Sequence, residues 1–274
     1  MQPLPVRLVH VTAVARPTPR TARVTFTTGD APASGVDQQV KLYFPRAGQS
    51  APVLPPADQD FLSWYQAYGA LPDDVRPPMR SYTLRAVRPD SFDIDFHLHA
   101  GDPGPATSWA LSAAVGDTLG MFGPAAYFAR PVPLADTLAA SRVLLIGDET
   151  AVPAIETILP AVPAGVPATA HLLVHDAAEE RPLPGHATVR WHHRAAGATL
   201  GGLAPALTAE VRPGLFTWLA GEAPEVRVLR RHLLAAGADR RAVDFTGYWR
   251  PTLSQDDAPT ADDLADAQEL LAQA

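Results

Sequence analysis

Cysteine is absent from this 274-residue chain, and Lys41 is its only lysine. The lack of cysteine excludes disulfides, thiol catalysis and cysteine-ligated zinc or iron–sulfur centres. A phosphate-binding P-loop needs a Gly-Lys-Ser/Thr triplet, whereas Lys41 stands between Val40 and Leu42 in an extended run. We therefore expect neither a P-loop nor a Schiff-base lysine, and any redox chemistry must use a non-covalent cofactor.

The sequence also lacks a basic excess and long apolar runs. Lys and Arg number 22 against 29 Asp and Glu, which gives a net charge of −7, so nucleic acid is not an expected partner. No stretch approaches the roughly 18 apolar residues of a membrane span, and the first residues lack the apolar core of a secretory signal. We expect a cytoplasmic monomer without membrane insertion.

The first part of the chain is typical of antiparallel β-structure, because short runs rich in Val, Thr, Phe and Leu alternate with Pro, Gly and Asp clusters. Six strands and one short helix predict a small closed barrel. A Pro-rich insertion with an aromatic cluster, residues 46–78, separates the third strand from the fourth. The expected strands are 6–14, 21–28, 36–44, 80–88, 91–100 and 118–122, and the helix is 105–114.

The rest of the chain alternates short apolar strands with helices, which predicts a parallel sheet covered on both faces. The acidic tail has six acids and no base after residue 254, and Thr260 with Asp263 could cap a final helix there. We expect a β-barrel domain at 1–128, a Rossmann-like α/β domain at 129–250 and a helical tail at 251–274. The expected strands are 143–146, 168–175, 188–192 and 215–220, with helices at 150–159 and 224–236.

The turn Gly147-Asp148-Glu149-Thr150 follows an apolar strand and opens a helix, which is where α/β sheets present ligands. It does not match the dinucleotide pattern G-x-G-x-x-G, and its two carboxylates would repel a pyrophosphate. The alternative interpretation is that Asp148 and Glu149 only stabilise the start of the helix.

Two further segments carry groups suited to a planar, phosphate-bearing ligand. In Arg80-Ser81-Tyr82-Thr83, a strand places Arg80 and Tyr82 on one face, where arginine can bind phosphate and tyrosine can stack on a ring. The glycine-rich turn after His99 runs into a helix start, whose free N–H groups suit a pyrophosphate. A surface strand and an ordinary loop are the alternatives.

Together these segments resemble the siderophore-interacting protein family, the flavin-dependent ferric-siderophore reductases related to ferredoxin–NADP reductases. The resemblance covers nearly the whole chain. One departure is Pro251, which stands where the family often has glycine, and another is a tail without the basic residue of one subgroup. The matching stretches are residues 40–45, 80–85, 95–99, 104–110, 116–117, 123–124, 147–155, 220–223 and 247–250.

The resemblance implies FAD on the barrel, with Arg80 at the pyrophosphate, Tyr82 against the flavin, and Thr83 as the catalytic residue near its reactive edge. It also implies that the turn after strand 143–146 and the aromatic end of the α/β domain lie beside the cofactor. The implied cofactor-binding residues are Arg80, Ser81, Tyr82, Thr83, His97, His99, Gly104, Pro105, Ala106, Thr107, Ser108, Asp148, Glu149, Thr150, Ala151, Tyr248 and Trp249.

The function implied is reduction of a ferric siderophore by electrons that pass from NADPH or NADH through FAD. A nicotinamide gives two electrons at once and ferric iron accepts one, and a flavin can serve both. Reduction to Fe(II) weakens the hold of hard oxygen donors and so releases the iron. A ferredoxin donor, a general NAD(P)H:flavin reductase and a non-catalytic siderophore carrier remain alternatives.

Many ferric siderophores are anionic, so we expect a local cationic patch despite the acidic composition. Lys41, Arg130 and Arg250 are the expected substrate-binding residues. Several histidines could share strand faces and resemble metal ligands, but no carboxylate has a convincing spacing beside them, and we expect no metal site. These histidines are His97, His99, His171, His175, His192 and His193.

Overall fold

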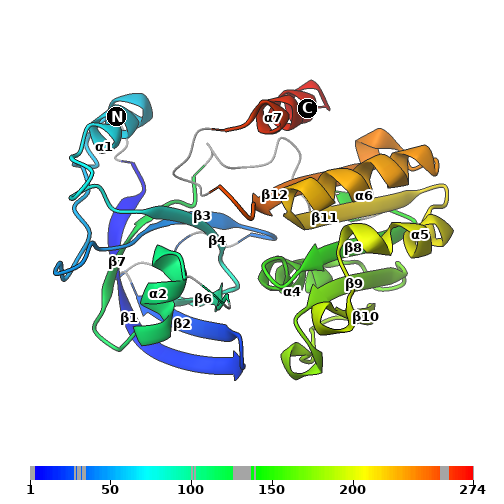
Figure 1. Cartoon of the computed structure of the whole chain (residues 1–274), viewed down its shortest axis with the longest axis horizontal. Coiled ribbons are helices and arrows are strands. Elements are labelled where there is room, and N and C mark those ends of the chain that lie inside the picture. Colours follow the sequence, from blue (N-terminus) through cyan, green and yellow to red (C-terminus); the bar gives the residue numbers. More distant parts are fainter. Residues whose placement is uncertain are drawn as a thin grey trace. The chain divides into compact units, whose positions relative to one another are not determined.

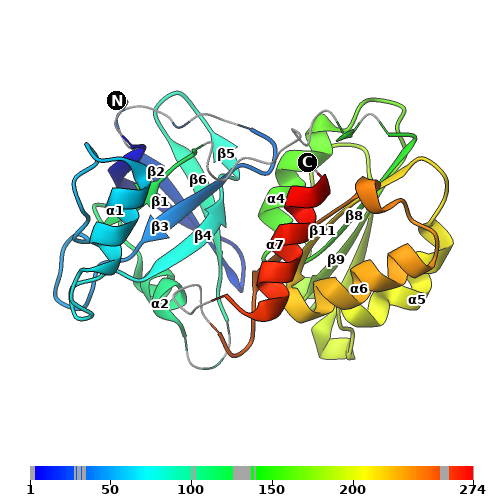
Figure 2. The same ribbon diagram turned by 90° about the horizontal axis from the view of Figure 1, so that it is seen from above.

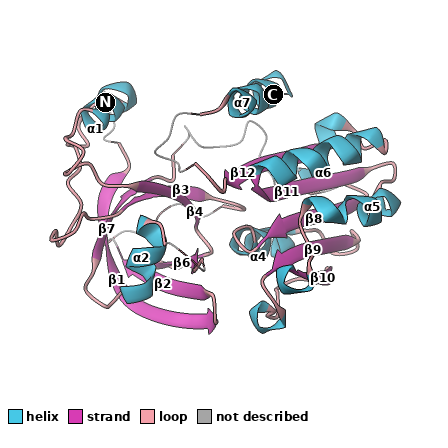
Figure 3. Ribbon diagram, in the orientation of Figure 1, coloured by secondary structure: helices cyan, strands magenta, loops and turns pink. Residues whose placement is uncertain are grey.

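The computed structural model describes residues 4–27, 29, 32, 35–99, 101, 103–125, 137–138, 140–253 and 259–273. These residues form two compact units, which divide between Ala129 and Arg130. The first unit holds an antiparallel sheet and the second a parallel sheet with helices, so the expected fold class is confirmed (Figures 1 and 3). Among the described residues, no helix combines the length and the apolar character needed to cross a membrane.

The sheet of the first unit has seven strands in the order β4-β3-β7-β1-β2-β6-β5. All its strand pairs are antiparallel. The helix α2 (Pro105–Ser112) follows β6. The strands are β1 (Val6–Thr18), β2 (Thr21–Thr27), β3 (Gln39–Tyr43), β4 (Met79–Thr83), β5 (Ala86–Val87), β6 (Phe92–His97) and β7 (Thr118–Phe122).

The single strand expected at residues 80–88 is wrong, because the structure divides it into β4 and β5. Leu84 N–H still donates to Gln38 C=O beside β3, but Arg85 N–H donates to Asp93 C=O in β6. The chain thus changes partners between these two residues. Since β4 and β5 are the two ends of the sheet order, this step holds the two ends next to each other, although no strand pairing among the described residues closes the sheet. We call this unit the barrel unit after its expected fold.

Alternation along β6 builds the core of this unit, as the sequence predicts. Phe92, Ile94 and Phe96 are all buried in one apolar cluster with the inner faces of the other strands. Asp93 and Asp95 point to the opposite face, and both are buried because arginines cover them. The outer face of this strand is therefore an ion-paired layer rather than open polar surface.

The insertion at residues 46–78 contains a helix that the sequence analysis did not expect, α1 (Phe61–Gly69). Trp64 is 1% exposed, and its ring lies 5.3 Å from Phe122 on β7 and 5.8 Å from Tyr43 on β3. Its indole N–H donates to Pro55 C=O at 3.1 Å. The insertion therefore has a core of its own that is anchored to the barrel sheet.

The sheet of the second unit has the strand order β10-β9-β8-β11-β12, and all its pairs are parallel. Strand β12 was not predicted from the sequence. The strands are β8 (Arg142–Asp148), β9 (Ala168–Val174), β10 (Thr188–His193), β11 (Leu215–Glu222) and β12 (Val243–Trp249). The helices are α4 (Val152–Ile158), α5 (Ala204–Leu207), α6 (Ala223–Ala235) and α7 (Ala261–Gln273), with 3₁₀ turns Leu159–Ala161, Ala177–Glu179, Arg194–Ala196, Gly201–Leu203, Thr208–Glu210 and Arg240–Ala242.

Helices cover both faces of this parallel sheet. Leu144 and Ile146 of β8 pack in one cluster with residues of α5 and α6. A Cβ on the next residue, Gly147, would point the other way and lie 3.5 Å from Ile155 of α4.

The chain steps from β8 to β9 on one side, and β11 lies on the other side of β8, so the strand order reverses there (Figure 2). The carboxyl edge at such a reversal is where α/β folds bind ligands.

His171 and His192 form a pair on neighbouring strands of this sheet. Their Nδ1 and Nε2 atoms lie 3.1 Å apart and their rings are nearly parallel. Burial, and then the nearby His192 and Arg190, lower the pKa of His171 to about 4. Burial also lowers the pKa of His192. No group of three or more metal-ligating side chains occurs in the described part of the chain, and the lowered pKa values favour the neutral form of both rings.

This pair predicts a pH dependence of stability. An unfolded histidine has a pKa of about 6.5. As the pH falls from there to about 4, the unfolded chain binds a proton at His171 that the folded chain resists, so the free energy of unfolding decreases. His171→Leu should flatten this slope in urea unfolding measured between those pH values. His186→Gln, which changes an exposed histidine of the same unit, should not. Equal slopes in the His171→Leu variant and the unchanged protein would contradict the prediction.

Candidate functional site

The segment Arg80–Thr83 lies on β4, paired with β3. Arg80 is opposite Leu42 and Tyr82 is opposite Val40, and both of these partners are buried in the barrel core. Tyr82 packs against the same core, and burial raises the pKa of its hydroxyl well above the ordinary value. The Tyr82 ring is therefore a neutral aromatic surface. Arg80 remains partly exposed on the same strand face.

A line of aromatic rings joins β4 to α2. The ring of Tyr82 lies 4.5 Å from that of Phe96, which in turn lies 5.4 Å from that of Trp109 on α2. Trp109 also contacts Phe44 at 5.8 Å and Phe26 at 6.2 Å, so the helix is fixed on the core. The structure thus brings together, through Phe96, two segments that the sequence separates by about twenty residues.

The amino terminus of α2 offers backbone donors and space. Its N-cap is Gly104, which has no side chain to bond the free N–H groups, and the helix begins at Pro105. A Cβ on Gly104 would meet no other atom of the described residues within 4 Å. The hydroxyl of Ser108 donates to Pro103 C=O at 3.0 Å, while Ala106 and Thr107 are buried. This turn can therefore receive an oxyanion close to the backbone.

The remaining predicted residues of the first unit lie near these two segments in the chain. His97 ends β6, and its ring meets that of the exposed His99 edge-on at 4.8 Å. Ser81 and Thr83 point to the face of β4 opposite Tyr82, and Thr83 is buried.

In the first unit, Arg80, Tyr82 and the α2 turn together supply a cation, a flat ring and backbone donors. These are the groups that a dinucleotide such as FAD requires, so the residues present fit it.

In the second unit, Asp148 organises the predicted turn at residues 147–150. Its side chain is fully buried at the carboxyl end of β8. Its Oδ1 accepts from Thr150 N–H at 2.9 Å and from the Thr150 hydroxyl at 2.5 Å. Its Oδ2 accepts from Glu222 N–H at 2.9 Å and from the Trp249 indole N–H at 2.8 Å. Both oxygens are therefore surrounded by donors, and the carboxylate ties together the ends of β8, β11 and β12.

A glycine makes room for this carboxylate. Gly221 has φ +147°, and a Cβ there would lie 2.6 Å from Asp148 Oδ2. Neither Asp148 nor Glu149 bonds the helix start directly, because the N-cap of α4 is Ala151 and has no side-chain bond. The interpretation that these acids only stabilise the start of the helix is therefore wrong for Asp148, whose carboxylate holds strand ends together.

Glu149 and Arg194 form an ion pair beside Asp148. Arg194 Nε lies 3.1 Å from Glu149 Oε1, and its Nη2 lies 3.8 Å from Asp148 Oδ2. Burial and the Asp148 charge raise the pKa of Glu149, although Arg194 opposes the shift. The positive charge of Arg194 therefore offsets the negative charges of Asp148 and Glu149, which the sequence suggested would repel a pyrophosphate. No pattern in the sequence identified Arg194, which comes from the turn after β10.

Tyr248 and Trp249 end β12 but face opposite ways. The Trp249 indole reaches Asp148, whereas the Tyr248 ring meets the fully buried Trp218 edge-on at 6.4 Å. Only Trp249 is thereby joined to the turn that contains Asp148. Tyr248 packs on its own sheet.

The expected substrate-binding cations have different surroundings. Lys41 Nζ lies 3.2 Å from Ser81 Oγ, and burial lowers the pKa of the lysine. Arg250 forms an ion pair with Asp263 of α7 at 2.5 Å. Arg130 lies outside the described residues. The cap predicted for the last helix from Thr260 and Asp263 is confirmed at α7, whereas the pairing of Asp263 with Arg250 was not predicted.

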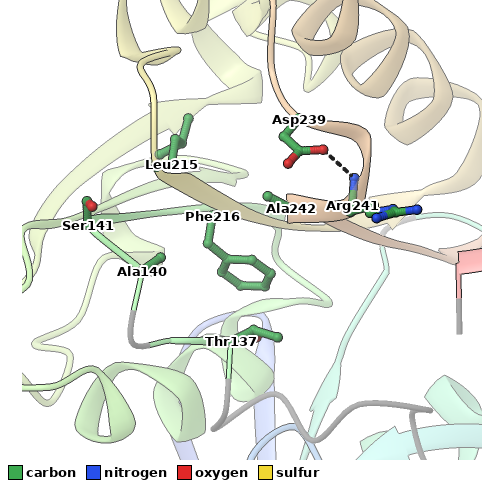
Figure 4. Close-up of a pocket in the computed structure, with 9 residues that line it drawn as sticks. Thr137, Ala140, Ser141, Leu215, Phe216, Asp239, Arg241 and Ala242 are labelled. Atoms are coloured by element: carbon green, nitrogen blue, oxygen red, sulfur yellow. Dashed lines mark hydrogen bonds between the residues drawn. The ribbon is translucent and has the colours of Figure 1, made fainter.

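A pocket of about 380 Å³ lies at the opposite, amino-terminal edge of the parallel sheet (Figure 4). Phe216 and Ser141 line it, together with Asp239, which accepts a hydrogen bond from Arg241 N–H. None of the predicted site residues is among its described lining residues. It is therefore separate from the Asp148 turn.

Two family models together match most of the chain. Residues 10–128 match the siderophore-interacting FAD-binding domain, and residues 140–252 match the siderophore-interacting protein model. The first match confirms FAD as the expected cofactor of the barrel unit.

Named relatives agree with these models. The chain is 31% identical over 190 residues to ferric acinetobactin reductase of Acinetobacter baumannii; the match covers 67% of this chain and 64% of that one, less than two thirds of its length. A siderophore utilization protein from T. fusca has a TM-score of 0.74 and 32% identity, covering 94% of this chain and 97% of that one. The siderophore-interacting protein SipS of Aeromonas hydrophila has a TM-score of 0.69 and 28% identity, covering 92% and 94%.

The Asp148 contacts predict that the carboxylate cannot be replaced by its amide. In Asp148→Asn, one oxygen that accepts two donors becomes an NH₂ group, which leaves those buried donors unpaired and lowers the free energy of unfolding by about 3 kcal/mol. Trp249→Phe removes a single donor and should cost about 1 kcal/mol. Urea unfolding followed by circular dichroism measures both. An Asp148→Asn variant as stable as Trp249→Phe would contradict this account.

Proposed function

Because this chain belongs to the siderophore-interacting protein family, we propose that it is an FAD-dependent reductase of ferric siderophores. The observation that carries the proposal is that Phe96 contacts both Tyr82, which lies on the strand of Arg80, and Trp109 of α2 in the barrel unit. Arg80, Tyr82 and the first turn of α2 supply the groups that FAD requires. A parallel α/β unit whose strand order reverses beside β8 follows in the same chain, as a nicotinamide donor would need.

Each residue then has a definite role. The Arg80 guanidinium and the N–H groups of the first turn of α2 hold the pyrophosphate, and the neutral Tyr82 ring packs against the isoalloxazine. Thr83 is the predicted hydroxyl beside the reactive edge. Bound FAD supplies the conversion of a two-electron donation into one-electron steps. The protein supplies position, a dry aromatic support and fixed positive charge.

Ferric siderophores are the proposed substrates because one-electron reduction is also the release step. Fe(III) prefers hard oxygen donors strongly, and Fe(II) prefers them less, so reduction weakens the complex. No protein acid or covalent nucleophile is needed for this reaction. Lys41, Arg130 and Arg250 remain the proposed cations for the anionic complex. Of these, Arg250 must exchange its ion pair with Asp263 before it can bind substrate.

The donor is proposed to be NADPH or NADH, which places the reaction in the cytoplasm, with a ferredoxin as the alternative donor. Glu149 already pairs with Arg194 at the carboxyl edge of the parallel sheet, and Asp148 is fully bonded. A dinucleotide phosphate there would thus meet fewer uncompensated negative charges than the sequence alone suggests. We propose that the chain acts as a monomer.

Anaerobic visible spectroscopy of the purified protein tests the proposed function. We expect a flavin band near roughly 450 nm that NADPH or NADH bleaches and that a ferric siderophore restores, with Fe(II) captured by a ferrous chelator. Bleaching only by chemical reductant, with restoration by the ferric siderophore, would indicate a ferredoxin donor. Loss of flavin in gel filtration would favour a flavin reductase. A protein without flavin, or one that binds the ferric complex without reducing it, would overturn the proposal.

The role of Arg80 is tested by its effect on FAD retention. Arg80→Gln removes the cation from the predicted pyrophosphate site and should weaken FAD binding by about tenfold to a hundredfold, as expected for a charge-assisted contact. Arg7→Gln removes an arginine from β1 of the same unit and should leave affinity unchanged. Fluorescence titration of the apoprotein with FAD measures both constants. Equal affinities in the two variants would remove Arg80 from the site.

A further inference from the structure

Two arginines converge on one carboxylate at the carboxyl edge of the parallel sheet. Arg227 Nη2 lies 2.7 Å from Asp263 Oδ1, and Arg250 Nη2 lies 2.5 Å from Asp263 Oδ2. A second α7 acid, Asp266, accepts from Arg227 Nε at 2.7 Å. Arg250 directly follows β12, and Arg227 lies in the second turn of α6, which begins where β11 ends. We call Arg227 and Arg250 the arginine pair.

The geometry of the arginine pair is that of an oxyanion site. Two guanidinium groups that reach the two oxygens of one carboxylate present the planar donors that phosphates and carboxylates bind. Both side chains are largely covered, with 18% and 23% exposure, so their charges are only partly screened by water. The carboxyl edge is also the edge at which α/β folds bind their ligands.

Over residues 261–268, the described contacts of α7 with the arginine pair are ion pairs. Within residues 261–268, Asp263 and Asp266 are the only residues that are not exposed, and both contact the arginine pair. Leu264 is 53% exposed, whereas a helix that packs permanently buries its apolar stripe. These ion pairs weaken as the salt concentration rises, because ions in solution screen the charges. Added salt or a competing anion should therefore loosen the hold on α7, which lies beside α6 in Figure 2.

We propose that the arginine pair is a binding site for an oxyanion group of a ligand, and that α7 occupies it with Asp263 and Asp266 as an internal competitor. The incoming group is a phosphate or another group with at least two negative oxygens, because it must replace two carboxylates. Hydrogen bonds from Thr260 and the two arginines, opposed by burial, lower the pKa of Asp263 to about 2. The competitor therefore stays charged at neutral pH, and ligand concentration and ionic strength control its release.

The absence of cysteine makes the release of α7 directly measurable. Ala267→Cys introduces a single thiol at an exposed position of α7 for a fluorescent label. Inorganic pyrophosphate is titrated into the full-length protein at constant ionic strength, with chloride as the balancing ion. We expect the label anisotropy to fall as pyrophosphate displaces the helix. With Arg227→Gln, the anisotropy should already be low and pyrophosphate should not change it.

Matched substitutions on α7 separate competition from a general charge effect. Asp266→Asn removes one competing carboxylate and keeps the Asp263 cap, and should tighten pyrophosphate binding by up to about tenfold, the limit reached if α7 fills the site about nine-tenths of the time before the change and no longer fills it afterwards. Asp262→Asn makes the same charge change on the same helix, but its side chain is 77% exposed and 3.7 Å from Arg227, so binding should change by no more than about twofold. Isothermal titration calorimetry measures the constants. Equal affinity in the two variants, or binding without a fall in anisotropy, would overturn the proposal.

The same assay identifies the source of the oxyanion. NADPH and NADH differ by one phosphate, so displacement of α7 by NADPH alone assigns the arginine pair to that phosphate. Displacement by both dinucleotides assigns it to their pyrophosphate, and displacement by an anionic ferric siderophore assigns it to the substrate. These assignments rest on the proposed function, but the pyrophosphate titration does not. If pyrophosphate releases α7 while no ferric siderophore is reduced, the proposed function fails and this inference stands.

Discussion

The buried carboxylate of Asp148 is the interaction on which the second unit depends. Removing a charge from water costs several kcal/mol, and only a full set of donors offsets that cost. Asp148 obtains them from its own turn, from the start of α6 and from the last residue of β12. Three strand ends are thereby fixed at one point, beside the place where the strand order reverses. A binding edge is thus built without a glycine-rich phosphate loop.

This arrangement explains an acidic turn at a position that commonly receives phosphate. The carboxylate of Asp148 is directed inward as a structural acceptor, and that of Glu149 is neutralised by Arg194. Positive charge at the same edge comes instead from the arginine pair, whose charge is occupied by acids of α7. In a chain with a net charge of −7, the few arginines at this edge are each matched to a particular carboxylate.

The barrel unit uses aromatic packing where the α/β unit uses charge. Tyr82, Phe96 and Trp109 form a continuous contact from β4 to α2 and so fix the distance between the predicted stacking ring and the free N–H groups of the helix. Phe96 belongs to the barrel core, and Tyr82 and Trp109 pack against that core. A preformed site of this kind loses little conformational entropy when a rigid, planar cofactor binds.

Local patterns predicted much of this architecture. Strict alternation located β6, and a strand bounded by turns located β7 to the residue. The same reasoning missed α1, whose aromatic residues bury against β3 and β7, and joined β4 to β5, because a change of hydrogen-bond partner leaves no mark on composition. Strand β12 was missed although it completes the parallel sheet: Val243 and Phe245 alternate with polar residues and are buried, and Phe245 packs in one cluster with residues of α6 and β11.

The sequence by itself determined the fold class, the family and FAD as the cofactor, because periodicity and motif order are local properties of the chain. Only the tertiary structure decided which charges meet. Asp148 bonds Trp249 from about one hundred residues away, Glu149 pairs with Arg194, and the tail acid Asp263 joins Arg227 to Arg250. An ion pair depends on a separation of a few ångströms in space, and that separation is set by the packing of strands and helices rather than by spacing along the chain.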